Sequence, residues 1–377
     1  MTEPVLLLTK TGFHDPRDGG SLRVAAVVRE LQRHVGPVRA VAIEEVDGPA
    51  EAGRVGALPL LWANLRVLWQ FARIGSLSAA RWYRPRVVRE LVAARGTVNP
   101  RVSVIEYSQL LGYRPVFRGR VVLDMHNIES ELMANYSTSS SRIKACVARY
   151  EAWRLRHLES HIGRYADAVA VVSDHDRDVL QGLLHESVAV VVAPNGVGDD
   201  GFDLDLVRDD VVVFVGHLGW APNVDAAVWL CESVWPRVAT RAPQARLKLV
   251  GRSPAKRVQN LRGETVEVHA DVPSVLPHVA SAKVATAPLL AAGGTRLKIL
   301  EALSCGTPVV ATPLGALGLA HLAGRGLDIH EGAAAFADAI VTRLSMPSEP
   351  AVPREASELF RWPSALEQLV SVVAGHA

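Results

Sequence analysis

The sequence has few cysteines, no long apolar run and almost no net charge. Its three cysteines (Cys146, Cys231 and Cys305) lie far apart without CxxC spacing, which argues against a disulfide framework or a zinc site and favours free thiols in a reducing cytoplasm. No apolar run reaches the ~18 residues that span a bilayer, and no basic region precedes the first apolar run, so we expect neither a transmembrane helix nor a signal peptide. Lys plus Arg number 41 against 39 Asp plus Glu, and this balance gives no general attraction to nucleic acid.

What the sequence has instead is an alternation of short apolar runs with longer amphipathic segments. Apolar runs bounded by turns are typical of strands buried on both faces of a sheet, and helices between them imply parallel βαβ units. Ten or more such runs are too many for one small sheet, so we predict two doubly wound α/β domains. The runs are VLLLT, VRAVAI, VSVIEY, VVLDMH, AVAVVS, VAVVVAPNG, VVVFVGH, ARLKLVG, ETVEVHA, AKVATAPL and TPVVATP.

The boundary between the domains is predicted in the stretch GDDGFDLDLVRDD, which is rich in Gly and Asp and poor in apolar residues. We therefore expect an N-terminal domain over residues 1–195 and a C-terminal domain over residues 196–359. The tail, residues 360–377, is helical by periodicity and contains no strand run.

The most informative stretch is AAGGTRLKILEAL, which begins at Ala291. Gly293 and Gly294 permit close approach of the backbone, and Thr295 is a suitable N-cap for the helix that follows. The free amides and the dipole of a helix N-terminus favour an anion, and Arg296 and Lys298 add full positive charges. These features predict a phosphate or diphosphate site.

Glu301 lies three residues after Lys298 on the same helical face. A carboxylate cannot bind phosphate, but it can accept hydrogen bonds from the vicinal hydroxyls of a ribose. Phosphate and ribose together indicate a nucleotide. The alternative is a capped helix with a surface Lys–Glu pair.

A second glycine loop, DPRDGGSLR, follows the first strand run, and Gly19 and Gly20 precede an amphipathic helix. Alone, this loop is as well explained by a plain turn. Ligands of parallel α/β folds bind beyond the carboxyl ends of the strands, so two such loops, one per domain, are consistent with one ligand held from both sides.

Two further loops follow strand runs. In VVLDMHNIESEL, His126 falls just past the end of a strand, with Asp124, Asn127 and Glu129 placed to orient it or to bind hydroxyls; a structural histidine is the alternative. In VVVFVGHLGWAPNVDA, Gly216 ends a strand before a helix started by a proline. His217 there either contacts phosphate or fills the loop.

The segment from Leu58 to Arg95 contains three tryptophans, many leucines and repeated arginines, with little acid. A helix packed on its own sheet is the first interpretation. The alternative is a surface for an acceptor or for an anionic membrane.

Together these motifs resemble the retaining, nucleotide-sugar-dependent glycosyltransferases of family four (glycosyltransferase group 1), especially bacterial members. The resemblance rests on VLDMHNIESE, FVGHLGWAPNVDA and GGTRLKILEALSCGTPVVAT, with ADAVAVVSDHDRDVL and VVAPNGV between them, and it covers nearly the whole chain. It implies the GT-B fold, in which two Rossmann-like domains face each other across a cleft and the C-terminal helix crosses back to the N-terminal domain.

The resemblance also implies residue roles. The C-terminal domain is expected to bind the donor, with Lys298 on the diphosphate and Glu301 on the ribose. His126 is expected beside the transferred sugar. The residues expected to be catalytic are His126 and Glu301. The full donor set is Gly19, Gly20, Gly216, His217, Arg252, His269, Gly293, Gly294, Thr295, Arg296, Lys298 and Glu301. The acceptor side, in the N-terminal domain, is Asp15, Arg23, Trp82, Tyr83, Tyr107, Asn127 and Glu129.

One position departs from the family pattern. The family often has two glutamates in an E-x7-E arrangement, and Gly293 occupies the first position while Glu301 matches the second. Glycines in this loop are the usual form in the subfamily that this sequence most resembles.

The expected reaction is transfer of a hexose-like unit from a nucleoside diphosphate to a hydroxyl group, with retention, in cell-envelope glycan or natural-product biosynthesis. No cofactor and no metal are expected, because Lys298 and Arg296 supply the positive charge. The expected partners are a nucleotide sugar and a small-molecule or lipid-linked acceptor, but no nucleic acid. A cytoplasmic location is expected, and peripheral contact of residues 58–95 with the inner face of the membrane is the alternative to packing of this segment on its own sheet. A non-catalytic nucleotide-sugar-binding scaffold and a nucleotide-sugar epimerase are the alternatives.

Overall fold

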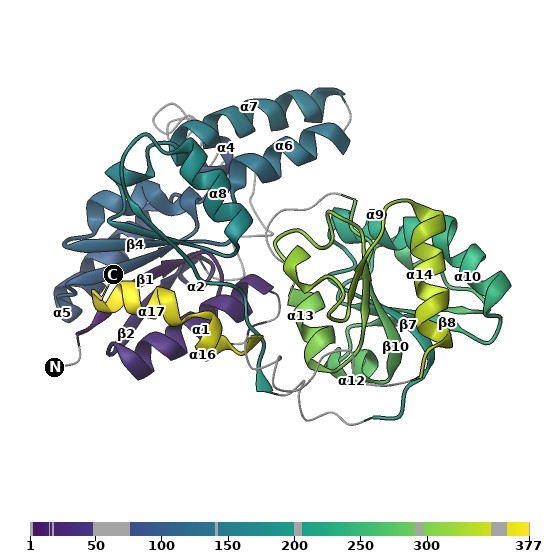
Figure 1. The fold of residues 1–377 in the computed structure, drawn as a ribbon. Coiled ribbons are helices and arrows are strands. Elements are labelled where there is room, and N and C mark those ends of the chain that lie inside the picture. The colour runs from purple at the N-terminus through teal and green to yellow at the C-terminus, as the bar shows by residue number, and fades with distance from the viewer. Residues whose placement is uncertain are drawn as a thin grey trace. The chain divides into compact units, whose positions relative to one another are not determined.

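The computed structural model describes residues 3–14, 16, 19–47, 76–139, 142–199, 206–290, 297–347 and 360–376. The chain divides into two compact units (Figure 1). Unit 1 comprises Met1–Pro194 and Leu366–Ala377, and unit 2 comprises Asn195–Ala365. Each unit is a parallel six-stranded sheet with helices, which confirms the predicted pair of doubly wound α/β domains.

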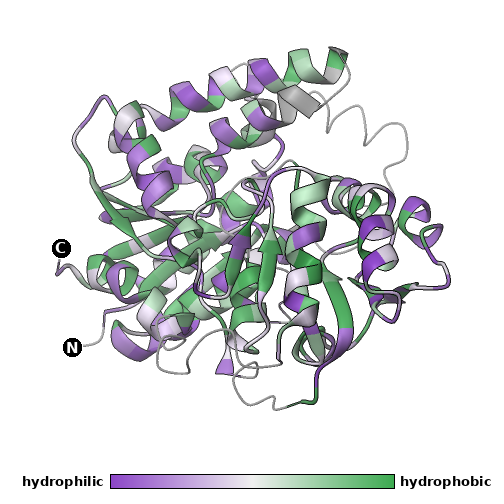
Figure 2. Ribbon diagram, turned by 45° about the vertical axis from the view of Figure 1, so that its right-hand side comes forward, coloured by the Kyte–Doolittle hydropathy of each residue, from purple (hydrophilic) through white to green (hydrophobic). Residues whose placement is uncertain are grey.

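The sheet of unit 1 has the strand order β2-β1-β3-β4-β5-β6. Strands β1, β3 and β5 are buried along their whole length, as their continuous apolar runs predict, and the strands are mostly green in Figure 2. The strand order reverses between β1 and β3, which is where open α/β sheets place ligands. The strands are β1 (Val5–Thr9), β2 (Val38–Ala42), β3 (Val102–Glu106), β4 (Arg120–Met125), β5 (Ala168–Val171) and β6 (Ala189–Val192).

The helices of unit 1 alternate with these strands and bury one apolar side each. In α5, for example, Val87, Leu91 and Ala94 recur at helical spacing and are buried in the core under the sheet. The helices are α1 (Gly19–His34), α2 (Ile43–Asp47), α4 (Leu77–Ala80), α5 (Pro85–Val98), α6 (Glu129–Ser139), α7 (Arg142–Glu159) and α8 (Asp174–Leu183), with short 3-10 turns η1 (Ser108–Val116) and η2 (Ile162–Arg164).

Unit 2 has the strand order β12-β11-β10-β7-β8-β9, which reverses between β7 and β10. Its strands are β7 (Asp209–Val215), β8 (Arg246–Gly251), β9 (Val266–Ala270), β10 (Ala282–Ala287), β11 (Val309–Ala311) and β12 (Leu327–Ile329). Among the strands of the described residues, β12 was not one of the predicted runs, because its Leu-Asp-Ile sequence contains a charged residue and is only partly buried. The helices are α9 (Ala221–Trp229), the π-helical turn η4 (Leu230–Val234), α10 (Trp235–Arg241), α11 (Lys256–Gln259), α12 (Leu276–Ala280), α13 (Leu297–Ser304), η5 (Ala320–Leu322), α14 (Ala333–Ser345) and α16 (Trp362–Ala365).

The tail is helical in two pieces rather than one. α16 belongs to unit 2, whereas α17 (Glu367–Ala374) packs on unit 1 against α1 and the strands β3 to β6. Arg120 Nη1 donates to the carbonyl of Val372 (2.7 Å), and Leu369 and Val373 are buried. The C-terminal helix is therefore part of the N-terminal unit, as the resemblance implies.

The Trp-rich segment 58–95 is described only in part, because residues 48–75 lie outside the described ranges. Its remaining helices, α4 and α5, pack within unit 1. Within the described ranges, no helix has the length and apolar character needed to cross a membrane.

Candidate functional site

In unit 2, the loops after β7 and β8 approach each other without room for side chains. A Cβ atom at Gly251 would lie 1.7 Å from the carbonyl oxygen of Gly216, and φ of Gly251 is +153°. A Cβ atom at Gly216 would lie 2.8 Å from Asn223 Nδ2. Glycine is therefore required at both positions, and it brings bare backbone to the carboxyl edge of this sheet.

Lys298, near the start of α13, is held at this edge. Its Nζ atom lies 3.1 Å from Asn223 Oδ1 and 4.6 Å from the centre of the Phe214 ring. Asn223 is 4% exposed, and its Nδ2 atom donates to the carbonyl of His217 (3.0 Å), which fixes the orientation of the amide. The lysine ammonium group thus has a defined position at the reversal between β7 and β10.

Glu301 lies one turn further along α13. Burial raises the pKa of its carboxyl group, and the charge of Lys298 lowers that pKa. Glu301 and Lys298 therefore lie on one helix and interact electrostatically. This arrangement is suitable for binding a sugar hydroxyl beside a phosphate. Gly293, Gly294, Thr295 and Arg296, the other predicted donor residues of this stretch, lie outside the described residues.

The remaining predicted donor residues of unit 2 follow β7 and β8 or lie near the end of β9. His217 is exposed, and the carbonyl of Arg252 accepts a hydrogen bond from the amide of Leu218 (2.9 Å), which joins the two loops. His269 Nε2 lies 2.7 Å from Glu267 Oε2, and this contact lowers the pKa of Glu267. His269 therefore has a partner on its own strand.

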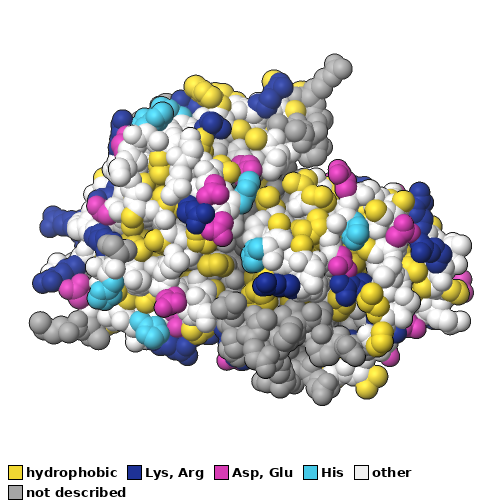
Figure 3. All heavy atoms as spheres, viewed as in Figure 1, with side chains coloured by type: hydrophobic (Ala, Val, Ile, Leu, Met, Phe, Trp, Pro, Cys, Tyr) yellow, Lys and Arg dark blue, Asp and Glu magenta, His cyan; other side chains and the backbone are white. Residues whose placement is uncertain are grey.

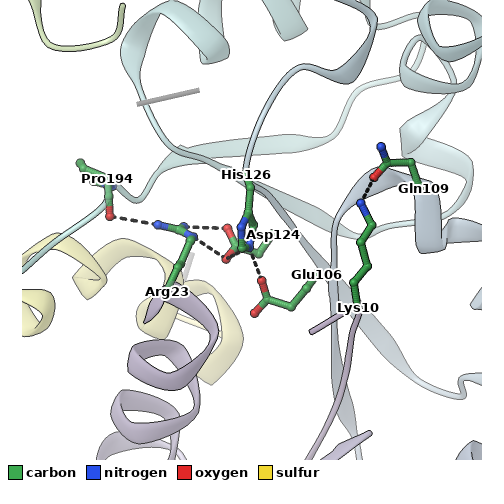
Figure 4. A network of polar contacts seen from close by, with 7 residues as sticks. All are labelled: Lys10, Arg23, Glu106, Gln109, Asp124, His126 and Pro194. Atoms are coloured by element: carbon green, nitrogen blue, oxygen red, sulfur yellow. Dashed lines mark hydrogen bonds and ion pairs between the residues drawn. The ribbon is translucent and has the colours of Figure 1, made fainter. Parts of the chain in front are cut away.

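In unit 1, a buried ion pair joins the first helix to the sheet (Figure 4). Arg23 on α1 donates from Nε to Asp124 Oδ2 (2.9 Å) and from Nη2 to Asp124 Oδ1 (2.7 Å). Its Nη1 atom donates to the carbonyl of Pro194 (3.0 Å). Arg23, a residue predicted for the acceptor side, is only 1% exposed and joins α1 to β4 within unit 1.

Next to this ion pair, His126 contacts the carboxyl group of Glu106, which was not predicted from the sequence. His126 Nε2 lies 2.6 Å from Glu106 Oε2, and the rings of His126 and Tyr107 are 3.9 Å apart. Complete burial raises the pKa of Glu106 to about 7, against the lowering effect of Arg23. The Glu106 carboxyl group therefore titrates near neutral pH, in direct contact with the His126 ring.

Tyr107 has a strained backbone, with φ of +76°, although it is not a glycine. Its amide donates to the carbonyl of Asp124 (2.8 Å), which keeps the turn after β3 against β4. Backbone strain of this kind is held only where the surroundings enforce it, and it occurs often at functional sites.

Lys10, directly after β1, extends the cluster. Its Nζ atom contacts Gln109 Oε1 (Figure 4). The same atom lies 4.0 Å from the ring centre of Tyr107 and 5.4 Å from that of Trp82. Burial lowers the pKa of Lys10 to about 8, while the charge of Glu129 raises it. Trp82 and Tyr107, both predicted for the acceptor side, thus lie around one buried lysine.

The other predicted residues of unit 1 have varied surroundings. Glu129 is buried, and its backbone amide donates to Glu159 Oε1 (2.8 Å). The ring of Tyr83 stacks on that of Tyr113 at 4.9 Å, and Asn127 is half-buried beside Glu129. Gly19 and Gly20 are the first residues of α1, and Asp15 lies outside the described residues.

The sequence analysis therefore missed Lys10, Glu106 and Gln109. Lys10 and Glu106 end or follow the strand runs VLLLT and VSVIE, so position at a strand end was an available signal for both. Glu106, Asp124 and His126 place one ligand atom each within 4.8 Å of one another. Because Asp124 already holds the guanidinium of Arg23 with both oxygens, this cluster is an ion-pair network rather than a cation site.

Comparisons with known proteins agree with this architecture. Residues 209–346 match the model of a family described as "Glycosyl transferases group 1", which covers β7 to α14. A comparison with curated protein sequences gives no match.

Solved structures are similar over nearly the whole chain. A sucrose-phosphate synthase from Thermosynechococcus elongatus superposes with a TM-score of 0.70 at 16% identity, covering 98% of each chain. HepE of Anabaena, in complex with UDP and glucose, has a TM-score of 0.65 at 16% identity and covers 99% of this chain and 100% of its own. A glycosyltransferase from Rickettsia africae has a TM-score of 0.64 at 12% identity and covers 100% and 98%. The chain therefore has the GT-B fold, and its C-terminal unit is similar to group 1 glycosyl transferases.

Proposed function

We propose that the protein is a glycosyltransferase that moves a sugar from a nucleoside-diphosphate donor to a hydroxyl acceptor. The observation that carries this proposal is the contact of Lys298 with the buried amide of Asn223, which fixes a cation at the carboxyl edge of the unit 2 sheet. A coupled carboxyl group, Glu301, follows one turn later. Both residues lie in the stretch that matches group 1 glycosyl transferases.

In this proposal Lys298 neutralises the charge that develops on the leaving diphosphate. A cation that is already positioned stabilises the transition state more than the ground state and needs no reorganisation during the reaction. Glu301 accepts hydrogen bonds from the ribose hydroxyls. Arg296 and the helix N-terminus are expected to contribute to the same task, so the proposed reaction requires no metal and no cofactor.

Unit 1 is proposed to bind the acceptor, with His126 next to the sugar that is transferred. Glu106 can hold or release a proton near neutral pH, because burial brings its pKa to about 7, and it lies in contact with His126. Such a pair is suited to move a proton at the acceptor hydroxyl.

Finer features of the reaction follow from the sequence resemblance. We expect a hexose-like donor sugar, retention of the anomeric configuration, and a cytoplasmic role in bacterial envelope-glycan or natural-product biosynthesis. The acceptor is expected to be a small molecule or a lipid-linked glycan. UDP is the first nucleotide to test, because the similar HepE structure contains UDP and glucose.

The first experiment is thermal unfolding with UDP, GDP, dTDP, ADP and CDP. A ligand that binds only the folded state raises the unfolding midpoint by mass action. We expect one base to raise the midpoint above the others, and its nucleotide sugars then enter a transfer assay with hydroxyl acceptors. No shift with any of the five would contradict the assignment of Lys298 and Glu301 to a nucleotide site. Binding without transfer would support a scaffold, and donor conversion without an acceptor would support an epimerase.

A further inference from the structure

The outward side of α7 carries an unusual concentration of exposed apolar side chains. Ile143, Val147, Tyr150 and Trp153 are 81%, 49%, 41% and 60% exposed, and they follow one another at three- or four-residue intervals along the helix. They therefore form one continuous stripe, which we call the α7 face. The other exposed large apolar side chains of the described residues are divided among several elements of both units.

The acidic and basic side chains of α7 lie on opposite sides of the helix. Its two acidic side chains, Glu151 and Glu159, are 5% and 0% exposed and point inward. Arg149, Arg156 and His157 are exposed along the apolar stripe. The outward side of α7 is therefore apolar and basic, with no exposed acidic group of its own.

The buried glutamates hold the helix in place. Glu151 Oε2 accepts hydrogen bonds from the hydroxyl group of Ser76 (2.9 Å), which precedes α4, and from that of Ser78 (2.7 Å), which lies in α4. Glu159 Oε1 accepts from the amide of Glu129 (2.8 Å), at the start of α6. α6 lies alongside α7 in Figure 1, and the two helices are in extensive contact. These contacts hold α7, and therefore the α7 face, in a fixed position on unit 1.

The two aromatic side chains of the face, Tyr150 and Trp153, are of the types that bind at a membrane surface. The rings of Tyr150 and Trp153 are 6.1 Å apart, and the guanidinium of Arg154 lies 5.2 Å from the ring centre of Trp153. Trp and Tyr favour the boundary between lipid headgroups and acyl chains, because one end of each ring system is apolar and the other is polar. Figure 3 shows yellow and dark blue side chains together along the upper edge, where Figure 1 places α7.

We propose that the α7 face binds the surface of a bilayer that contains anionic lipids. An apolar stripe inserts between headgroups while flanking arginines bind lipid phosphates, which is the usual arrangement of interfacial helices. A second copy of the chain fits the face less well, because the exposed arginines of two copies would meet and repel each other. This surface is separate from the proposed donor site, and its test does not depend on glycosyl transfer.

The test is co-sedimentation of the full-length protein with vesicles of phosphatidylcholine, with and without phosphatidylglycerol. We expect binding to the anionic vesicles that weakens as salt is added. The double variant Ile143→Ser/Trp153→Ala should reduce the partition coefficient at least about tenfold, because it removes two inserted apolar side chains. Arg149→Gln/Arg156→Gln should reduce it by a similar factor on anionic vesicles only.

The matched control is Val207→Ser/Arg237→Gln in unit 2, which makes the same kinds of change at exposed positions away from α7. Its vesicle binding should equal that of the original protein, and all variants should keep the same unfolding midpoint. Lipids brominated in the acyl chains should quench the fluorescence of the original protein, and Trp153→Phe should bind equally well while losing most of that quenching.

Three outcomes would overturn the proposal. The original protein could fail to bind anionic vesicles, or the α7 variants could bind as well as the control. The third is a dimer, seen by light scattering, that Ile143→Ser/Trp153→Ala abolishes while no vesicle binding occurs. That result would make the α7 face an interface between copies.

Discussion

His126 Nε2 and Glu106 Oε2 lie 2.6 Å apart, although the two residues are 20 positions apart in the chain. Glu106 ends β3 and His126 follows β4, and these strands are neighbours in the unit 1 sheet. Parallel pairing therefore brings together two groups that the sequence separates. Glu106 is completely buried at this contact, and its pKa is raised to about 7.

His126→Ala is expected to lower turnover at least about tenfold, since it removes the ring that contacts Glu106 and that is proposed to lie beside the transferred sugar. Affinity for the nucleoside diphosphate should stay unchanged, because donor binding is assigned to unit 2. Steady-state transfer kinetics and calorimetric titration of the nucleotide separate the two quantities. Full activity of the variant would remove His126 from the site.

Glu106 should make the folded state less stable as pH rises. Its pKa is about 7 in the folded protein against an ordinary value of 4.5. Between these values the folded state keeps a proton that the unfolded state has lost, so the free energy of unfolding falls with increasing pH, by up to about 3 kcal/mol. Glu106→Gln removes this contribution.

The measurement is urea unfolding of both proteins at about pH 5 and about pH 8. The fall in stability between the two conditions should be smaller in Glu106→Gln than in the original protein. Glu90→Gln, at a half-buried position on α5 where the carboxylate pairs with Arg39 near the surface, is the control and should leave the fall unchanged. An equal fall in all three proteins would show that Glu106 ionises in the folded state as it does in the unfolded state.

Lys298→Ala should weaken binding of the nucleoside diphosphate by about 10- to 100-fold, the usual effect of losing a hydrogen bond to a charged group. Lys256→Ala, an exposed lysine of the same unit on α11, is the control. Calorimetric titration with the nucleotide that gives the largest thermal shift measures both variants. Unchanged affinity in Lys298→Ala would count against the donor site.

Gly251→Ala should destabilise unit 2 by more than about 3 kcal/mol, because the new Cβ atom would overlap backbone that cannot move. That atom would lie 1.7 Å from the carbonyl oxygen of Gly216. Gly263→Ala is the control, since a Cβ atom there meets nothing within 4 Å. Thermal unfolding should show a large fall of the midpoint for the first variant and little change for the second.

Arg23→Met should cost about 3–5 kcal/mol, because it leaves the Asp124 carboxyl group buried without its cation. The double variant Arg23→Met/Asp124→Leu should recover much of this loss, since no unpaired charge remains in the interior. Urea unfolding of the two variants and the original protein tests the pair. A double variant no more stable than Arg23→Met would show that packing, not charge, is what Arg23 contributes.

The fold was largely predictable because its signals are local. Apolar runs such as VLLLT and VVVFV are buried on both faces of a sheet, and their composition alone indicates this. β12 was missed because its three residues, Leu-Asp-Ile, include a charged one, and the tail was predicted as one helix where α16 and α17 are separate. The coupling of Lys298 and Glu301 was also foreseeable, because residues three positions apart share a helical face.

Only the tertiary structure decided which charges meet across the sheet. The pairing of Arg23 with Asp124, the contact of Glu106 with His126 and the position of Lys10 between aromatic rings all join residues on different elements. Their meeting depends on strand order and register, which composition and periodicity do not contain. By itself the sequence determined two parallel α/β units, and it predicts a nucleotide site at the start of α13. Burial, which shifts the pKa of Glu106 and Lys10, exists only in the folded chain, because it arises from excluding water.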